Sequence, residues 1–187
     1  MEARRWIWQP RGNAVHAALE CYSQVRFLEG RTAAEALLAV EGLPQHQTYR
    51  EWILPLLLLP LWDEVAVIAS ERLCCCLSRN LAGAFDGAYL SAVPPGLSPP
   101  GGEAGGKPLR VLYDLKTLSP RGRPYSTAAQ LGGYMVLESA QGKHYDLGQT
   151  IWSRPGVARA GHFHSRRKCL AAWTAAWTPY CLSQRPF

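Results

Sequence analysis

The chain has 187 residues, of which 48% are hydrophobic and 18% are charged, and its formal net charge is +6 at neutral pH. This length predicts one domain whose core needs no disulfide or structural metal, and this composition excludes a disordered chain. The longest apolar run, residues 52–62, contains Pro55 and Pro60 and is shorter than the roughly 20 residues that cross a bilayer. With no secretory signal after Met1, we expect a cytoplasmic protein, in the host cytosol if phage-encoded, with no membrane contact.

The first third of the chain predicts three helices. Residues 11–13 interrupt the chain with a glycine and an asparagine, and the helical spacing of apolar residues then predicts a helix over 14–28. Residues 32–40 predict a second helix, because a threonine at its start and a glutamate three residues later form a capping box. A third helix is expected over 47–59, with a leucine-rich face.

The rest of the chain predicts strands first and helices later. Short runs rich in β-branched and apolar residues predict strands at 65–68, 72–77, 84–93 and 109–115. Residues 94–108 are dominated by proline and glycine and predict a flexible loop between two strands. The remaining elements are a helix at 127–138, a strand at 149–152 and a helix at 168–177. This order indicates an α/β (α+β) fold with a central mixed β-sheet flanked by helices.

The positive charge is concentrated in the last quarter of the chain. Basic and acidic residues balance up to Gly142. Beyond it, the basic residues, opposed by Asp146, are Lys143, Arg154, Arg159, Arg166, Arg167, Lys168 and Arg185. The aromatic and imidazole side chains of the same stretch are Trp152, His162, Phe163, His164, Trp173 and Trp177. Such a stretch suits a phosphate backbone with exposed bases, and a solvated basic tail explains the charge equally well.

The six cysteines do not form a metal-binding pattern. Cys74, Cys75 and Cys76 are consecutive, so in a strand their side chains alternate between faces and cannot converge on one ion. The other three have no CxxC spacing. We therefore expect buried, reduced thiols that behave as small hydrophobic side chains.

One predicted strand carries a carboxylate and an ammonium group on the same face. Asp114 and Lys116 are two residues apart, and a second carboxylate, Asp86, lies next to a glycine on another predicted strand. Two carboxylates at the end of a sheet suit Mg²⁺ or Mn²⁺, and a lysine beside them can hold a water and offset charge on a phosphate. For the Asp-x-Lys triplet alone, an ordinary ion pair is the simpler interpretation.

Four short motifs follow one another along the chain. They are GNAVHAALE at 12–20, AGAFD at 82–86, DLKT at 114–117 and QLGGY at 130–134. In this order they resemble the PD-(D/E)XK nuclease superfamily and, more narrowly, its RecB-type exonuclease branch. The resemblance covers residues 6–177 and implies a restriction-endonuclease-like core that forms a single domain over residues 1–187.

The resemblance implies a catalytic and metal-binding set. Asp86, Asp114 and Lys116 match the catalytic residues of the family. His16, the two aspartates and the backbone carbonyl of Leu115 match the ligands of a Mg²⁺ or Mn²⁺ ion. The lysine matches the residue that positions the attacking water.

The resemblance also implies supporting residues. Gln130 and Tyr134 match a pair that supports the site and touches the DNA. Glu20, one helical turn after His16, is a secondary candidate: it either orients the imidazole or is a surface carboxylate, and the second interpretation is favoured. Glu71 falls where the family often has a glutamate, but we do not assign it to the metal.

The expected function is that of a Mg²⁺- or Mn²⁺-dependent deoxyribonuclease, an exonuclease that prefers single-stranded DNA ends and acts in repair or recombination. The alternative is a catalytically inactive nuclease-fold protein that binds DNA. The chain has no P-loop motif, so we expect a helicase or recombination partner to supply any unwinding. Several RecB-type members bind an iron–sulfur cluster with one early and three clustered late cysteines. Here Cys21 is early, but only Cys169 and Cys181 are late and they are far apart, so we expect no iron–sulfur cluster.

Overall fold

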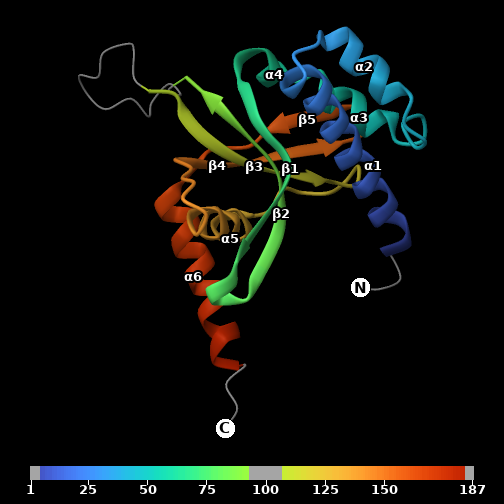
Figure 1. The fold of residues 1–187 in the computed structure, drawn as a ribbon. Helices are drawn as coiled ribbons and strands as arrows, with labels where there is room; N and C mark the ends of the chain where they lie inside the picture. The colour runs from blue at the N-terminus through green and yellow to red at the C-terminus, as the bar shows by residue number, and fades with distance from the viewer. Residues whose placement is uncertain (1–4, 93–106, 184–187) are drawn as a thin grey trace.

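A six-stranded mixed β-sheet lies between two layers of helices in the computed structural model, which describes residues 5–92 and 107–183 (Figure 1). The elements are, in chain order, α1 (Arg5–Ser23), the π-helical segment η2 (Gln24–Leu28), α2 (Ala33–Glu41), α3 (Arg50–Leu57), α4 (Leu61–Glu64), β1 (Ala66–Cys76), the 3-10 turn η3 (Leu77–Arg79), β2 (Leu81–Ser91), β3 (Leu109–Thr117), α5 (Ala128–Ser139), β4 (Leu147–Arg154), β5 (Val157–Ala160), β6 (His164–Ser165) and α6 (Arg166–Ser183). The predicted α/β (α+β) fold, with a central mixed β-sheet flanked by helices, is confirmed.

The strand order in the sheet is β1-β2-β3-β4-β5, and β6 pairs with β4. Strands β3 and β4 are parallel, while the other pairs are antiparallel. A parallel pair needs a crossover connection, and α5 supplies it between β3 and β4. The predicted Pro/Gly loop over 94–108 lies outside the described residues, except for its last two positions.

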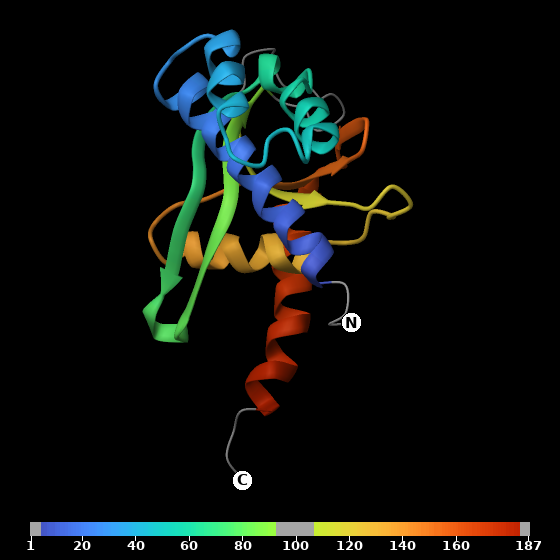
Figure 2. The same ribbon diagram turned by 90° about the vertical axis from the view of Figure 1, so that its right-hand side faces the viewer.

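The two faces of the sheet have separate hydrophobic cores. Helices α1 to α4 cover one face, and α5 and α6 cover the other, as the rotated view makes clear (Figure 2). On β3, Tyr113 and Leu115 belong to the core under α1, whereas Leu112 packs with Leu131 and Met135 of α5. Because both faces are covered, Val111 to Leu115 are all buried, including the aspartate between them.

The predicted break at residues 11–13 is wrong, because α1 runs without interruption from Arg5 to Ser23. Pro10 lies inside this helix, where it has no N–H to donate. Tertiary packing compensates: the Arg11 guanidinium lies 5.3 Å from the centre of the Trp52 ring, and the helix buries its apolar side on the sheet.

Other local predictions agree with the structure in part. Thr32 caps α2, and its hydroxyl and backbone N–H exchange hydrogen bonds with Glu35, so the capping box is confirmed. The strands predicted at 65–68 and 72–77 are one continuous strand, because β1 pairs with β2 along its length. The six cysteines are free. Cys74, Cys76 and Cys169 are buried as expected, whereas Cys75 is exposed and Cys21 and Cys181 are only partly buried. Within the described residues, no helix has the length and hydropathy to span a membrane.

Candidate metal centre

The site lies where β2 and β3 stop pairing. Their antiparallel ladder ends at the pair formed by Gly87 and Tyr113. Asp86 and Asp114 are the next residues of the two strands beyond this pair, so both carboxylates lie at the point where the strands diverge. Oδ2 of Asp86 accepts a short hydrogen bond from the backbone N–H of Leu115, which fills the gap left by the missing ladder partner.

The backbone of β1 and β2 departs from regular strand geometry beside the site. Glu71 has a φ of 40°, which a non-glycine residue rarely adopts. The residues before and after it on β1 pair with Gly87 and Phe85 on β2, so Glu71 lies opposite Asp86. On β2, Phe85 contacts Tyr134 of α5, so it lies on the face of the sheet that α5 covers. Ala88, three residues later, packs in the hydrophobic core on that same face. A regular strand places residues three apart on opposite faces, so the alternation breaks between them. Strained backbone of this kind costs on the order of 1–3 kcal/mol and is typical of functional sites.

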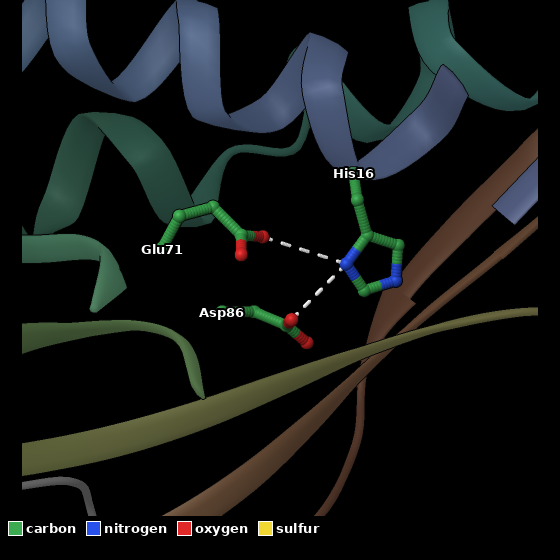
Figure 3. Close-up of side chains that lie close together, drawn as sticks. All are labelled: His16, Glu71 and Asp86. Carbon is green, nitrogen blue, oxygen red and sulfur yellow. Dashed lines mark ion pairs between the residues drawn. The ribbon is translucent and has the colours of Figure 1, made fainter. Parts of the chain in front are cut away.

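Three side chains from three elements converge at this point. His16 comes from α1, Glu71 from β1 and Asp86 from β2 (Figure 3). Nδ1 of His16 lies 3.0 Å from Oδ1 of Asp86 and 3.5 Å from Oε1 of Glu71. One ligand atom from each residue lies within 4.8 Å of the other two. This set of two carboxylate oxygens and one imidazole nitrogen is suited to a divalent cation.

The two carboxylates of the cluster need a positive charge close to them. Burial lowers the pKa of His16, but hydrogen bonds to Asp86 and Glu71, together with their charges, outweigh it and raise that pKa to about 10. The imidazole is therefore protonated at neutral pH and acts as the counter-ion of the two carboxylates. A divalent ion would take over this role and release the proton, since only the neutral imidazole is a ligand.

Lys116 and Asp114 form a second pair beside the cluster. Nζ of Lys116 lies 2.8 Å from Oδ1 and 2.7 Å from Oδ2 of Asp114, so the two side chains share a face of β3 as predicted. Asp114 is only 1% exposed. Burial raises its pKa to about 6, the charge of Lys116 opposes this shift, and the charge of Asp86 adds to it.

An open cleft of about 550 Å³ reaches His16 and Glu71 of the three-residue cluster and Lys116 of the neighbouring pair. Its lining includes His16, Glu20, Glu71, Leu115, Lys116 and Tyr125. The cleft is large enough for a nucleotide-sized ligand, because small-molecule sites typically measure roughly 300–1,000 Å³.

Gln130 and Tyr134 lie on the α5 side of the site. Nε2 of Gln130 donates a 2.9 Å hydrogen bond to the hydroxyl of Tyr134, so the i, i+4 pair shares one helical face. The two residues line a hollow of about 150 Å³ beside Gly83, separate from the cleft. Burial raises the pKa of Tyr134 to about 12. The hydrogen bond from Gln130 lowers this pKa, and the negative charges of Asp114 and Asp86 raise it further.

The structure divides the residues expected from the sequence into two neighbouring groups. His16 and Asp86 lie together, and Asp114 is paired with Lys116 rather than grouped with the imidazole. Leu115 is joined to the cluster through its amide N–H. Glu20 lines the cleft one turn after His16 and is exposed, as expected of a surface carboxylate.

Glu71 is the ligand-type residue that the sequence analysis left out of the metal set. Its carboxylate is in contact with His16, and it lies across the ladder from Asp86. The signal that would have found it is the register of β1 on β2, which brings two distant acidic residues opposite each other. That register is set by the pairing of the two strands, and no local pattern in the sequence indicates it.

Comparison with protein-family models and with curated proteins finds no match for this sequence. The nuclease resemblance therefore rests on the four motifs. The fold and the side-chain geometry define a candidate divalent-metal centre in an α/β protein.

Proposed function

We propose that this protein is a Mg²⁺- or Mn²⁺-dependent deoxyribonuclease of the PD-(D/E)XK type, and that it is an exonuclease that prefers single-stranded ends. The observation that carries the proposal is the convergence of His16, Glu71 and Asp86 next to the Lys116–Asp114 pair at the end of one strand ladder. A cation site, an ammonium group and an accessible cleft are the parts that phosphodiester hydrolysis requires.

The residues present fit a hard divalent cation. The carboxylates of Glu71 and Asp86 supply oxygen ligands, and His16 supplies a nitrogen once its proton has left. Asp86 is held in place by the Leu115 amide, so its second oxygen remains directed at the cluster. When bound, a divalent ion polarises a phosphate oxygen and lowers the pKa of a water.

Lys116 supplies a positive charge from the protein itself, in addition to the charge of the cation. Its ammonium group borders the cleft and is anchored by the buried carboxylate of Asp114. In this position it can hold a water by a hydrogen bond and neutralise charge that develops on a phosphate. Asp114 restricts the rotamers of the lysine, so the ammonium group needs little rearrangement during the reaction.

The proposal is tested with end-labelled single- and double-stranded DNA incubated with Mg²⁺, Mn²⁺ or EDTA. We expect the parent to shorten linear single strands in either metal and to be inactive in EDTA. Lys116→Ala should lower the rate about 100-fold or more, the typical cost of losing one electrostatic contact in a transition state. Asp86→Asn should abolish metal-dependent cleavage, because it removes a ligand charge. Glu41→Gln, which changes an exposed carboxylate on α2, is the matched control and should cleave like the parent.

Three outcomes contradict the proposal. Parent rates in Lys116→Ala and Asp86→Asn would remove the site assignment. Gel retardation of DNA without cleavage in either metal would favour the inactive DNA-binding alternative. Equal cleavage of closed circular and linear single strands would replace the exonuclease with an endonuclease.

A further inference from the structure

A second cavity lies beside the cleft, on the sheet edge formed by β4, β5 and β6. It measures about 520 Å³, and its lining includes Tyr125, Thr150, Trp152, Arg159, His162 and His164. Tyr125 also lines the cleft of the candidate metal centre, so one side chain borders both spaces. The two cavities are therefore neighbours.

The strand register connects this cavity to the catalytic lysine. Lys116 on β3 pairs with Trp152 on β4, and Trp152 pairs in turn with Arg159 on β5. Residues in register on neighbouring strands share a face and lie about 4.8 Å apart between strands. The sheet therefore carries a row of ammonium, indole and guanidinium groups that leads from the cleft into the second cavity.

The cavity has an aromatic wall. Tyr125 is 58% exposed, and its ring meets the Trp152 ring edge-to-face with 5.2 Å between centroids. Trp152 itself is 9% exposed, so it is a buried support for the tyrosine ring, more than half of which is exposed. An exposed, supported aromatic ring of this kind is a stacking platform for a base.

The cavity also has polar groups for an anion. Arg159 is exposed, and its guanidinium can bind a phosphate by two hydrogen bonds. His164 pairs with Gly148 on the same strand as Trp152, and its Nδ1 is buried without a hydrogen-bond partner among the described residues. The pKa of His164 is lowered by burial and by the charges of Lys168 and His162, so it is a neutral hydrogen-bonding group at neutral pH. None of the described residues that line this cavity is acidic.

We infer that this cavity binds one nucleotide of single-stranded DNA next to the scissile phosphate, with its base stacked on Tyr125 and its phosphate on Arg159. The inference rests on the proposed function and extends it by giving the substrate strand a path from Lys116 across Trp152. It also gives a role to the basic, aromatic C-terminal quarter of the chain. A closed duplex presents no unstacked base to Tyr125, so the subsite selects single strands.

Binding in EDTA tests the subsite without catalysis. Fluorescence anisotropy would measure the affinity of the full chain for labelled dT12 and for an abasic strand of the same length. Tyr125→Ala should weaken dT12 binding at least fivefold and leave the abasic strand unaffected, because only a base can stack. Arg159→Ala should weaken both ligands and lower the slope of log affinity against log salt by about one.

Two matched controls separate this subsite from general surface effects. Tyr180→Ala removes a tyrosine of similar exposure, 54%, on α6, and Arg50→Ala removes an exposed arginine on α3. Both should bind like the parent. The inference is overturned if Tyr125→Ala binds both ligands as tightly as the parent does. It is also overturned if the parent binds dT12 and the abasic strand equally well, or does not bind dT12 at all.

The outcome for the subsite is separable from the outcome for the nuclease. If the parent shows the base-dependent binding but does not cleave in Mn²⁺, the subsite stands and the nuclease proposal fails. If the parent cleaves but Tyr125→Ala binds and cleaves normally, the nuclease stands and the subsite is overturned.

Discussion

Asp114 is a buried charge that contributes to the candidate site and lowers the stability of the folded protein. The carboxylate is almost fully buried and forms an ion pair with Lys116. Its pKa is raised from 3.8 to about 6 by burial, so the folded protein holds this proton more tightly than the unfolded chain does. Ionised Asp114 therefore destabilises the fold above pH 6, and this penalty vanishes as the pH falls towards 4.

We expect Asp114→Asn to be more stable than the parent at pH 7.5 in EDTA. The shift from 3.8 to about 6 corresponds to a penalty on the order of 3 kcal/mol, which the neutral amide does not carry. The difference in free energy of unfolding should shrink as the pH is lowered from 6 to 4, where the parent carboxylate becomes protonated. Urea denaturation of both proteins across this range is the measurement. A variant less stable than the parent at pH 7.5 would show that the Lys116 pair outweighs burial.

At the scale of elements, the contact between α5 and α6 depends on glycine. A Cβ at Gly132 would lie 2.1 Å from the carbonyl oxygen of Cys169, whereas one at Gly133 would lie 2.9 Å from the ring of Trp173. The first obstacle is backbone of the neighbouring helix, and the second is a side chain that can shift. The glycines of the QLGGY motif thus let α6 approach α5 closely, whatever role Gln130 and Tyr134 have.

Gly132→Ala should destabilise the protein although alanine is the better helix former. Helix propensity favours alanine by about 1 kcal/mol, but overpacking against a fixed backbone costs typically about 1–3 kcal/mol or more. Gly133→Ala is the graded control and should lose less, because the Trp173 ring can move. Thermal unfolding of both variants gives the comparison. A Gly132→Ala protein as stable as the parent would mean that α6 can shift away without loss.

The elements predicted best from the sequence are those with a local physical signal. The capping box of Thr32 and Glu35 satisfies helix N–H groups within four residues, so it needs no distant partner. The start of α1 was missed because its stability comes from elsewhere: Arg11 packs on Trp52, more than forty positions along the chain. Such a contact overrides the local tendency of Gly12 to interrupt a helix.

At the scale of the whole molecule, the candidate metal centre joins two layers. His16 belongs to the helical layer, while Glu71 and Asp86 belong to the sheet. A cation bound by all three would tie α1 to the β1–β2 hairpin in the folded state and would have no comparable site in the unfolded chain.

We therefore expect Mn²⁺ to raise the unfolding temperature of the parent. A ligand at 100 times its dissociation constant adds about 2.7 kcal/mol to the free energy of unfolding. Asp86→Asn should lose this stabilisation, and Glu41→Gln, on the exposed side of α2, should keep it. Scanning fluorimetry with and without Mn²⁺ measures both. An equal rise in Asp86→Asn would place the bound ion at some other position.

The amino-acid sequence alone determined the order of most elements, the shared face of Asp114 and Lys116, and the pairing of Gln130 with Tyr134, because each follows from a periodicity of 2 or 3.6 residues. Only the tertiary structure decided that Glu71 joins His16 and Asp86, and that Asp114 lies in the pair with Lys116 instead of in that cluster. The register of β1 on β2, the end of the β2–β3 ladder and the approach of α1 are non-local. They are set by the packing of segments far apart in the chain, which no local pattern records.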